Sequence, residues 1–471
     1  MKDKNIFVYL IISAVAILFQ LITLENQVAW IDEVMFTDSS VNALHGIGWV
    51  SHAWWGFPVS VYPPLYQFTL YGWISLFGFS LFSVRSLNIV LAFILGILLQ
   101  RLLKNIGVNM NAWKTLFFGL LFWFSVDFSW LFRNGRPDIL GATIATCLIL
   151  LWIRWQNNFS SSKKQQRILL TGIFLSTTAL LLTGLQNIVF TGLVILFLLF
   201  IHDKRKQLLL PLSSFMCGII TGVALLLLWI WYIDAIDCLF SFVLKQTRSV
   251  NQIVTDTTVT TETHTVERSF LQKIWGLYNY QSYLILMAIC AILTISQKNI
   301  KYFLPLIFIS FIPLLMRMAG NFPSYYIWMA YLPALLFVFI LMDKQENTWK
   351  YMILTAVSAM FIYNSLQQYT QRFDTADLKK MIRQSHIQKD DIVIAPFATL
   401  YEIMDMSDNV FFPGTFHLEN LPGKPKYAIT QEGNFYGCYE QTIDNYIHQY
   451  NYELIDSVSS PLTFRLYRLK E

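Results

Sequence analysis

Long apolar runs separated by short polar breaks occupy most of the first 366 residues. Each run is long enough to cross the hydrocarbon core of a bilayer as a helix. The runs lie at about 6–24, 84–103, 112–131, 138–155, 168–185, 186–202, 208–232, 279–296, 301–316, 327–342 and 350–366. This pattern predicts about eleven transmembrane helices, with only a short polar break at 183–187 dividing the fifth run from the sixth.

Two longer polar segments interrupt this series. Residues 25–83 are too polar and too rich in proline to span, but their Trp- and Tyr-rich stretches, such as 66–79, suit helices that lie in the membrane interface. Residues 233–278 form the second segment, and its Thr-rich centre at 255–265 lacks apolar periodicity. We therefore predict a first outer loop with interfacial helices and a second outer loop with a mobile centre.

The composition becomes that of a soluble domain after about residue 372. Periodicity predicts two helices and four strands there. The helices are expected at 374–385 and 441–451, and the strands at 391–395, 426–430, 453–458 and 462–468. The predicted organisation is an all-α polytopic membrane domain at 1–366, followed by a small α/β domain at 367–471.

Composition and charge support a membrane protein and give its orientation. The chain is 55% hydrophobic and 13% charged, whereas soluble domains contain about 25% charged residues. Its net charge of +5 comes from basic residues spread over short loops, which argues against a nucleic-acid partner. Placing these loops in the cytoplasm predicts a cytoplasmic N-terminus, a multi-pass protein of the cell (inner) membrane, and an extracytoplasmic C-terminal domain.

The candidate chemistry lies in the predicted outer connections. Ionisable groups against a bilayer are costly, so those that are present are candidates for function. The outer candidates are Asp32, Glu33, Arg85, Asp127, the group at 133–138 with Arg136 and Asp138, Gln186, Asn187, Arg317, Tyr325 and Tyr326. Acidic and basic groups on one face suit a site that handles a lipid phosphate and a sugar together.

The chemistry of such a reaction needs one base. A sugar on a lipid phosphate departs as a phosphate anion, so the leaving group needs charge stabilisation and no proton. Asp32 is then the predicted base and Glu33 a group that positions substrate, while arginines bind phosphate bidentately. The same two carboxylates are the predicted ligands if a divalent cation such as Mg²⁺ or Mn²⁺ is used, and the sequence predicts no other cofactor.

These residues resemble a known family. Asp32-Glu33 in the first outer loop, 62–66 (YPPLY) followed by 76–78 (LFG), Arg85 and 136–138 (RPD) look like the GT-C glycosyltransferases. The nearest branch is the protein mannosyltransferase and aminoarabinose transferase group, glycosyltransferase family 39. Tyr325-Tyr326 with Leu332-Pro333 is similar to a late segment of that family.

The resemblance implies transfer of a sugar from a polyprenyl-phosphate donor, by direct displacement with inversion, on the outer face. It implies a base at Asp32, a positioning role for Glu33, and a site shaped by Arg136 and Asp138. Family members often have Lys-Gly after a Thr near position 183, and this chain has Thr183-Gly184 without the lysine. A phosphate contact is then missing or supplied elsewhere, for which Arg85, Lys245, Arg248 and Arg317 are candidates.

Other interpretations stay open from sequence alone. Arg85 and Arg136 also suit anchors to lipid headgroups, and Asp138 also suits the first turn of a helix. Tyr62 and Tyr66 flank the prolines and are the aromatic candidates for sugar or lipid contact. The chain as a whole also suits a transporter or flippase of lipid-linked sugars, or a non-catalytic component of envelope polysaccharide assembly. The acceptor is left open between a glycolipid, a polysaccharide and a protein.

Overall fold

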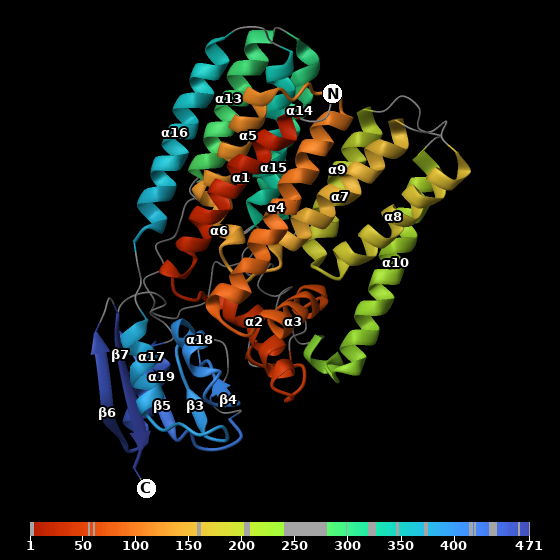
Figure 1. The fold of residues 1–471 in the computed structure, drawn as a ribbon. Helices are drawn as coiled ribbons and strands as arrows, with labels where there is room; N and C mark the ends of the chain where they lie inside the picture. The colour runs from red at the N-terminus through yellow and green to blue at the C-terminus, as the bar shows by residue number, and fades with distance from the viewer. Residues whose placement is uncertain are drawn as a thin grey trace, which may run out of the picture.

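A bundle of helices, a thin middle layer and a small sheet make up the protein (Figure 1). The structure is a computed structural model. It describes residues 4–54, 57–59, 62–157, 162–201, 208–239, 280–297, 299–318, 326–344, 348–371, 375–413, 418, 421–432, 440–459 and 462–470. The N-terminus lies at the far end of the bundle, and the C-terminus lies beside the sheet (Figure 1).

Every predicted apolar run contains a helix. The bundle helices are α1 (Lys4–Ile22), α4 (Leu81–Asn105), α5 (Ala112–Phe124), α6 (Val126–Phe132), α7 (Asp138–Asn157), α8 (Lys163–Leu181), α9 (Leu185–Ile201), α10 (Leu209–Tyr232), α13 (Gln281–Gln297), α14 (Phe303–Met318), α15 (Trp328–Asp343) and α16 (Trp349–Tyr369). Short breaks separate most neighbouring helices, and the two longer segments fall after α1 and after α10, as the sequence pattern predicts.

The run at 112–131 is the exception to the prediction of one straight helix per run. It is divided at Ser125 into α5 and α6, which are bent by 69° relative to one another. Ser125 is extended, and its side chain accepts a hydrogen bond from the backbone of Phe128, so it caps the second helix. The bend directs the end of α6 towards the middle layer of the molecule.

Four helices are long and apolar enough to cross a membrane by length and composition: α1, with the turn that follows it, α4, α7 and α10. The α5–α6 pair makes a fifth if it is one span, and α9, α13, α14 and α15 are shorter apolar helices. These helix counts refer to the residue ranges that the structure describes. The protein is a mostly helical, polytopic membrane protein.

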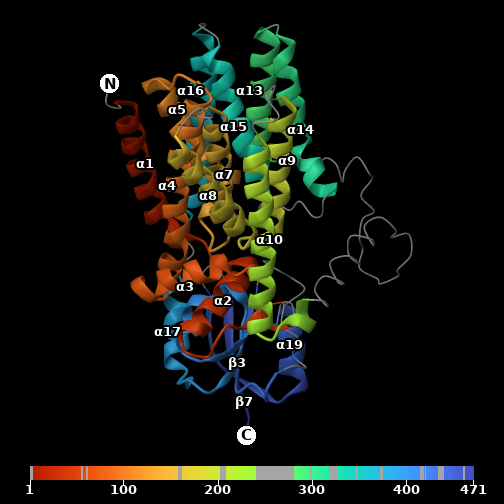
Figure 2. The ribbon, with the colours of Figure 1, turned by 90° about the vertical axis from the view of Figure 1, so that its right-hand side faces the viewer.

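The middle layer comes from the first predicted outer loop. It contains the short 3-10 helix η1 (Leu24–Asn26), α2 (Ile31–Leu44) and α3 (Leu65–Phe77), which lie across the end of the bundle (Figure 2). Gly78 ends α3 with a φ of +78°, a conformation that a side chain disfavours. A small antiparallel hairpin, β1 (Val50–Trp54) and β2 (Phe57–Val59), also lies here and was not predicted.

The C-terminal segment forms a five-stranded sheet in the order β4-β3-β5-β7-β6. Strands β3 (Ile392–Ile394), β4 (Asn409–Phe411) and β5 (Tyr427–Glu432) are parallel, and β7 (Thr463–Leu469) is antiparallel to β5 and to β6 (Tyr452–Ser459). The helices of this segment are α17 (Ala376–Gln384), α18 (Leu400–Ile403) and α19 (Glu440–Gln449). The two longer helices and four of the strands match the predicted segments, while β4 and α18 were missed.

One hydrophobic cluster joins the middle layer to this α/β segment. It includes Val34 of α2, Tyr66 of α3, Val84 of α4, and Tyr401 of α18. The backbone N–H of Phe412 also donates to the carbonyl oxygen of His52 in the hairpin at 3.2 Å. The α/β segment is therefore packed directly on the layer that carries Asp32 and Glu33.

The predicted mobile centre at 255–265 lies outside the described residues.

Candidate active site at the start of α2

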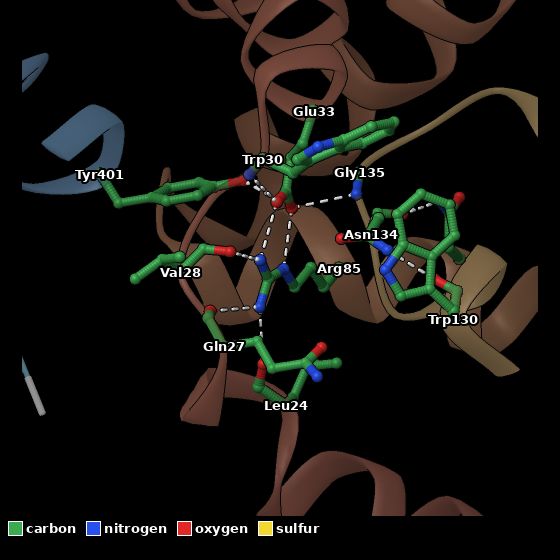
Figure 3. Close-up of polar contacts among 11 residues, drawn as sticks. Leu24, Gln27, Val28, Trp30, Glu33, Arg85, Trp130, Asn134, Gly135 and Tyr401 are labelled. Atoms are coloured by element: carbon green, nitrogen blue, oxygen red, sulfur yellow. Dashed lines mark hydrogen bonds and ion pairs between the residues drawn. The ribbon is translucent and has the colours of Figure 1, made fainter. Parts of the chain in front are cut away.

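The two carboxylates that open α2 have different partners. Glu33 is fully buried and pairs with the equally buried Arg85 of α4, with Nε 2.8 Å from Oε1 and Nη2 2.7 Å from Oε2 (Figure 3). Arg85 also donates from Nη1 to the carbonyl oxygens of Leu24 and Gln27, both at 2.8 Å, and from Nη2 to that of Val28 at 2.9 Å. All five N–H groups of the guanidinium are thus used inside the protein.

Three more donors reach the Glu33 carboxylate. The Gly135 backbone N–H and the Tyr401 hydroxyl donate to Oε1, each at 3.0 Å, and the Trp30 backbone N–H lies 3.4 Å from Oε2 (Figure 3). Glu33 therefore connects α2 with α4, with the loop after α6, and with α18. This arrangement is typical of a buried structural carboxylate, whose charge must be paired and hydrogen-bonded.

Asp32 lies in a more open environment. Its carboxylate is bonded to Nη1 of Arg136, and Nε of Arg136 is 2.8 Å from Oδ2 of Asp138. The side chain of Asp32 is 18% exposed, whereas those of Arg136 and Asp138 are 3% and 1% exposed. Arg136 thus lies between two carboxylates, and Asp32 is the one that solvent or substrate can reach.

The loop that carries Arg136 is held from several sides. Asn88 Nδ2, one turn after Arg85 on α4, donates to the carbonyl oxygens of Asn134 and Arg136. Gly135 has no room for a side chain, because a Cβ there would lie 2.5 Å from Cγ1 of Val84. These contacts fix the backbone on both sides of Arg136, so its guanidinium is presented to Asp32 in a defined place.

Arg133, at the start of the same loop, has partners other than the carboxylates of Asp32 and Asp138. It donates to the Gln20 side chain at 2.5 Å and to the Thr23 hydroxyl at 3.0 Å, and its guanidinium lies 3.9 Å from the ring centre of Tyr369. Arg133 therefore ties the loop to the end of α1 and to α16.

The two candidate tyrosines have different surroundings. Tyr62 packs its ring edge-on against Phe36, with centroids 4.8 Å apart, and accepts a hydrogen bond from Gln186 Nε2 of α9 at 2.6 Å. Phe36 also lies 5.3 Å from the Arg136 guanidinium. Tyr66 is fully buried, and burial, together with the nearby Glu33 charge, raises the pKa of its hydroxyl well above the usual value. Tyr62 is thus connected to Arg136 through Phe36, whereas Tyr66 belongs to the hydrophobic cluster that also contains Val34.

The remaining candidates cannot be placed against this site. Tyr325, Lys245 and Arg248 lie outside the described residues, and for Arg317 only the backbone, in α14, is described.

An apolar cavity lies in the bundle between α4, α7, α9, α14 and α15. Its volume is about 730 Å³, within the range of about 300–1,000 Å³ that is typical of ligand pockets. Its lining includes Leu102, Ala145, Phe190, Phe308, Trp328 and Leu336. Phe190 lies one helical turn after Gln186, the partner of Tyr62. The lining is mostly apolar and extends to Ile106 and Lys301, near the end of α4 opposite Arg85.

Comparison with known proteins places this geometry in a known fold. ArnT from Cupriavidus metallidurans in the apo state superposes with a TM-score of 0.64 over 97% of each chain, at 13% identity. ArnT bound to undecaprenyl phosphate gives 0.63 over 99% of this chain and 98% of that one, also at 13% identity. The fold is that of the GT-C glycosyltransferases.

A second GT-C protein shows the same likeness. The archaeal oligosaccharyltransferase AglB from Archaeoglobus fulgidus, in complex with an inhibitory peptide and a dolichol-phosphate, gives a TM-score of 0.55 at 11% identity, over 91% of this chain and 70% of that one. No family model and no curated protein matches the sequence. At these identities the likeness establishes the fold.

The structure brings together part of the predicted set of site residues. Asp32, Arg136 and Asp138 form one connected group, as expected from their order along the chain. Arg85 and Glu33 are also paired, but with each other and inside the protein, so their contacts favour a structural role over contact with substrate. Gln186 was among the predicted outer-face candidates, whereas Asn88 and Tyr401 were not. Asn88 was recognisable as a polar residue one turn after Arg85, whereas nothing local marks Tyr401.

The two carboxylates of this GT-C fold do not suit a shared metal site as they stand. Each one already faces a guanidinium, Asp32 that of Arg136 and Glu33 that of Arg85, and the two side chains serve different partners. Within the described ranges there is no group of three or more His, Cys, Asp or Glu side chains that could hold a metal ion. We therefore assign no reaction step to a metal.

Asp38, which is fully buried, and His52, which is partly buried, predict an unusual dependence of stability on pH. Asp38 of α2 accepts hydrogen bonds from the Ser51 hydroxyl at 2.9 Å and the His52 backbone at 2.7 Å. Burial raises the pKa of Asp38 from 3.8 to about 7, and burial lowers the pKa of His52 from 6.5 to about 4. Between about pH 4 and 7, Asp38 is therefore protonated in the native protein and ionised in the unfolded chain. Between about pH 4 and 6.5, His52 is neutral in the native protein and protonated in the unfolded chain.

These two shifts have opposite effects. The Asp38 contribution to the free energy of unfolding falls as pH rises from about 4 to 7, and the His52 contribution rises from about pH 4 to 6.5. In Asp38→Asn, which keeps an oxygen acceptor, we expect a gain in stability over wild type that grows from pH 4 to pH 7 and then levels off, reaching a few kcal/mol at most. Thermal unfolding between pH 4 and 8 measures it. His52→Asn should show the opposite trend, and a pH-independent difference in both variants would contradict the assignment.

Proposed function

We propose that this protein is a membrane glycosyltransferase that moves a sugar from a polyprenyl-phosphate donor to an acceptor hydroxyl. Its 1–366 segment is the transferase domain, and its 367–471 segment is an α/β domain on the same side as Asp32. That side is the extracytoplasmic, periplasmic face of the inner membrane, with the N-terminus in the cytoplasm. The acceptor is a glycolipid, a polysaccharide or a protein.

The observation that carries this proposal is the Asp32–Arg136–Asp138 group. It combines one reachable carboxylate with a buried, well-held guanidinium, in a GT-C fold whose solved relatives include complexes with undecaprenyl phosphate and with a dolichol-phosphate. The reachable carboxylate is the group that can take the proton of an acceptor hydroxyl. Asp138 fixes the guanidinium from the other side, so Asp32 has one preferred orientation.

The proposed reaction needs only these groups for its proton and charge balance. Asp32 accepts the proton of the acceptor hydroxyl as the acceptor oxygen bonds to the anomeric carbon. The bond from that carbon to the phosphate oxygen breaks, and the lipid phosphate leaves with the bonding electrons. As Asp32 is protonated it loses its attraction for Arg136, whose charge then stabilises the leaving phosphate. Attack opposite the leaving group inverts the anomeric centre.

The apolar cavity suits the polyprenyl chain of the donor, because each buried methylene contributes roughly 0.8 kcal/mol. Ala145, which is 1% exposed, lines it from α7. We expect Ala145→Phe to fill part of the cavity and to raise the KM for a long-chain donor by about tenfold, the loss expected from about two methylenes. The kcat value should change little. Steady-state kinetics with long-tailed and short-tailed donors measure this.

Val223→Phe is the matched control, since Val223 is 41% exposed on α10 and lies away from the cavity. An equal rise in KM for the short-tailed donor would show that the cavity does not hold the chain.

The function itself is tested by release of free polyprenyl phosphate from a donor labelled in the lipid phosphate. Purified protein in lipid nanodiscs should release the lipid phosphate only in the presence of acceptor, and the product should have the inverted anomeric configuration by NMR. A transporter or flippase would move the intact donor across a membrane without cleaving it, and a non-catalytic assembly component would do neither. Either result would refute the proposal.

A further inference from the structure

The hydrogen bond from Tyr401 to Glu33 joins the start of α2 to the C-terminal segment, across 368 positions of sequence. Both side chains are buried at this contact, and the Tyr401 hydroxyl lies 3.0 Å from Glu33 Oε1 (Figure 3). The Tyr401 ring also stacks on Phe79, with centroids 5.4 Å apart and an interplanar angle of 29°. The ring is thus held by packing while the hydroxyl is aimed at the carboxylate.

Glu33 Oε1 takes part in contacts beside both Asp32 and Arg136. The same oxygen accepts from Arg85 Nε at 2.8 Å and from the Gly135 backbone N–H at 3.0 Å. Glu33 is the chain neighbour of Asp32, and Gly135 is the chain neighbour of Arg136. A displacement of Oε1 therefore acts on the backbone beside both residues of the pair.

We propose that Tyr401 is a positioning residue for the transfer reaction. Its hydroxyl holds Glu33 Oε1 where that oxygen fixes Gly135, and so keeps Arg136 against Asp32. The C-terminal α/β segment thereby determines the geometry of the base although it contributes none of the reacting groups. This inference rests on the proposed function for its catalytic consequence, but not for the contact itself.

The hydroxyl, more than the ring, carries this role. Burial and the Glu33 charge raise the pKa of Tyr401 well above its usual value, so the hydroxyl stays protonated and acts as a donor. Without it, Oε1 keeps two donors, Arg85 Nε and the Gly135 N–H, and loses one of the three hydrogen bonds that compensate its buried charge. The carboxylate then gains by moving towards the Arg85 guanidinium, and the Gly135 contact lengthens. Loss of the hydroxyl should therefore loosen the loop at 133–137 more than it lowers the stability of the whole fold.

The test is Tyr401→Phe, which removes the hydroxyl and keeps the ring on Phe79. We expect kcat to fall by about tenfold or more, the usual effect of losing one hydrogen bond to a charged group, with the donor KM unchanged. Hydrogen–deuterium exchange in peptides covering 133–138 should become faster. Tyr452→Phe is the matched control, because it removes a tyrosine hydroxyl bond in the same segment, to the carbonyl oxygen of Pro425 at 2.5 Å. That control should change neither kcat nor exchange at 133–138.

Unchanged exchange at 133–138 in Tyr401→Phe would overturn the inference, as would equal losses of kcat in Tyr401→Phe and Tyr452→Phe. If the wild-type protein released no lipid phosphate, the proposed function would fail, and the exchange measurement would still decide the positioning role. Faster exchange confined to Tyr401→Phe supports that role in either case.

Discussion

Replacing Asp32 with Asn is expected to abolish transfer while leaving the protein folded and able to bind its donor. Asn keeps the shape of the side chain and an oxygen that can accept from Arg136, but it cannot take the proton of the acceptor. A positioned general base typically contributes 10²–10⁴-fold to a rate, so kcat should fall by about that factor. The measurement is single-turnover release of labelled lipid phosphate, with the donor KM and the thermal midpoint recorded beside it.

Two further variants make this result specific. Asp32→Glu keeps a carboxylate but displaces it by one methylene, so it should retain part of the activity. Asp38→Asn removes a buried carboxylate from the same helix without touching Arg136, and should keep a rate close to wild type. Wild-type transfer by Asp32→Asn would remove Asp32 as the base. Loss of transfer together with loss of the fold would show that its pairing with Arg136 is structural.

The helical part of the fold follows from sequence because hydropathy determines which segments suit a bilayer. The bend at Ser125 does not, since apolar residues continue on both sides of it and a single extended residue divides the run. This local detail is important, because the bend brings the loop with Arg136 to α2. The missed strand β4, Asn409–Phe411, is as short as the predicted β3, Ile392–Ile394, but it begins with an asparagine, which is depleted in strands, whereas β3 consists of three β-branched residues.

The candidate site was predictable as a set of residue types and not as a set of partners. Asp32, Arg136 and Asp138 could be grouped because two short motifs lie on the same predicted face. Sequence could not show that Arg85 pairs with Glu33, because the alternative partner, a donor phosphate, has the same chemistry as a carboxylate. Tyr401 could not be predicted from sequence for another reason, because its contact with Glu33 depends on how the α/β segment packs on the middle layer.

Arg85→Met is expected to prevent stable folding, which separates a structural from a phosphate-binding role for Arg85. The substitution leaves the Glu33 carboxylate buried without its cation and leaves three backbone carbonyl oxygens without their donor. Removing one partner of a buried ion pair typically costs about 3–5 kcal/mol, a large share of the stability of most proteins. We expect little monodisperse protein in detergent, and a much lower thermal midpoint in whatever is recovered.

A control variant on α4 and a double variant of the Glu33–Arg85 pair test this prediction. Arg101→Met removes an exposed arginine of α4 and should leave yield and thermal midpoint unchanged. Adding Glu33→Gln to Arg85→Met removes the unpaired charge, so the double variant should recover part of the stability lost in the single one. A well-folded Arg85→Met protein with a raised donor KM would instead mean that Arg85 binds the phosphate. Because Arg85 uses all five N–H groups on Glu33 and the backbone, its guanidinium reaches a phosphate only if that network opens.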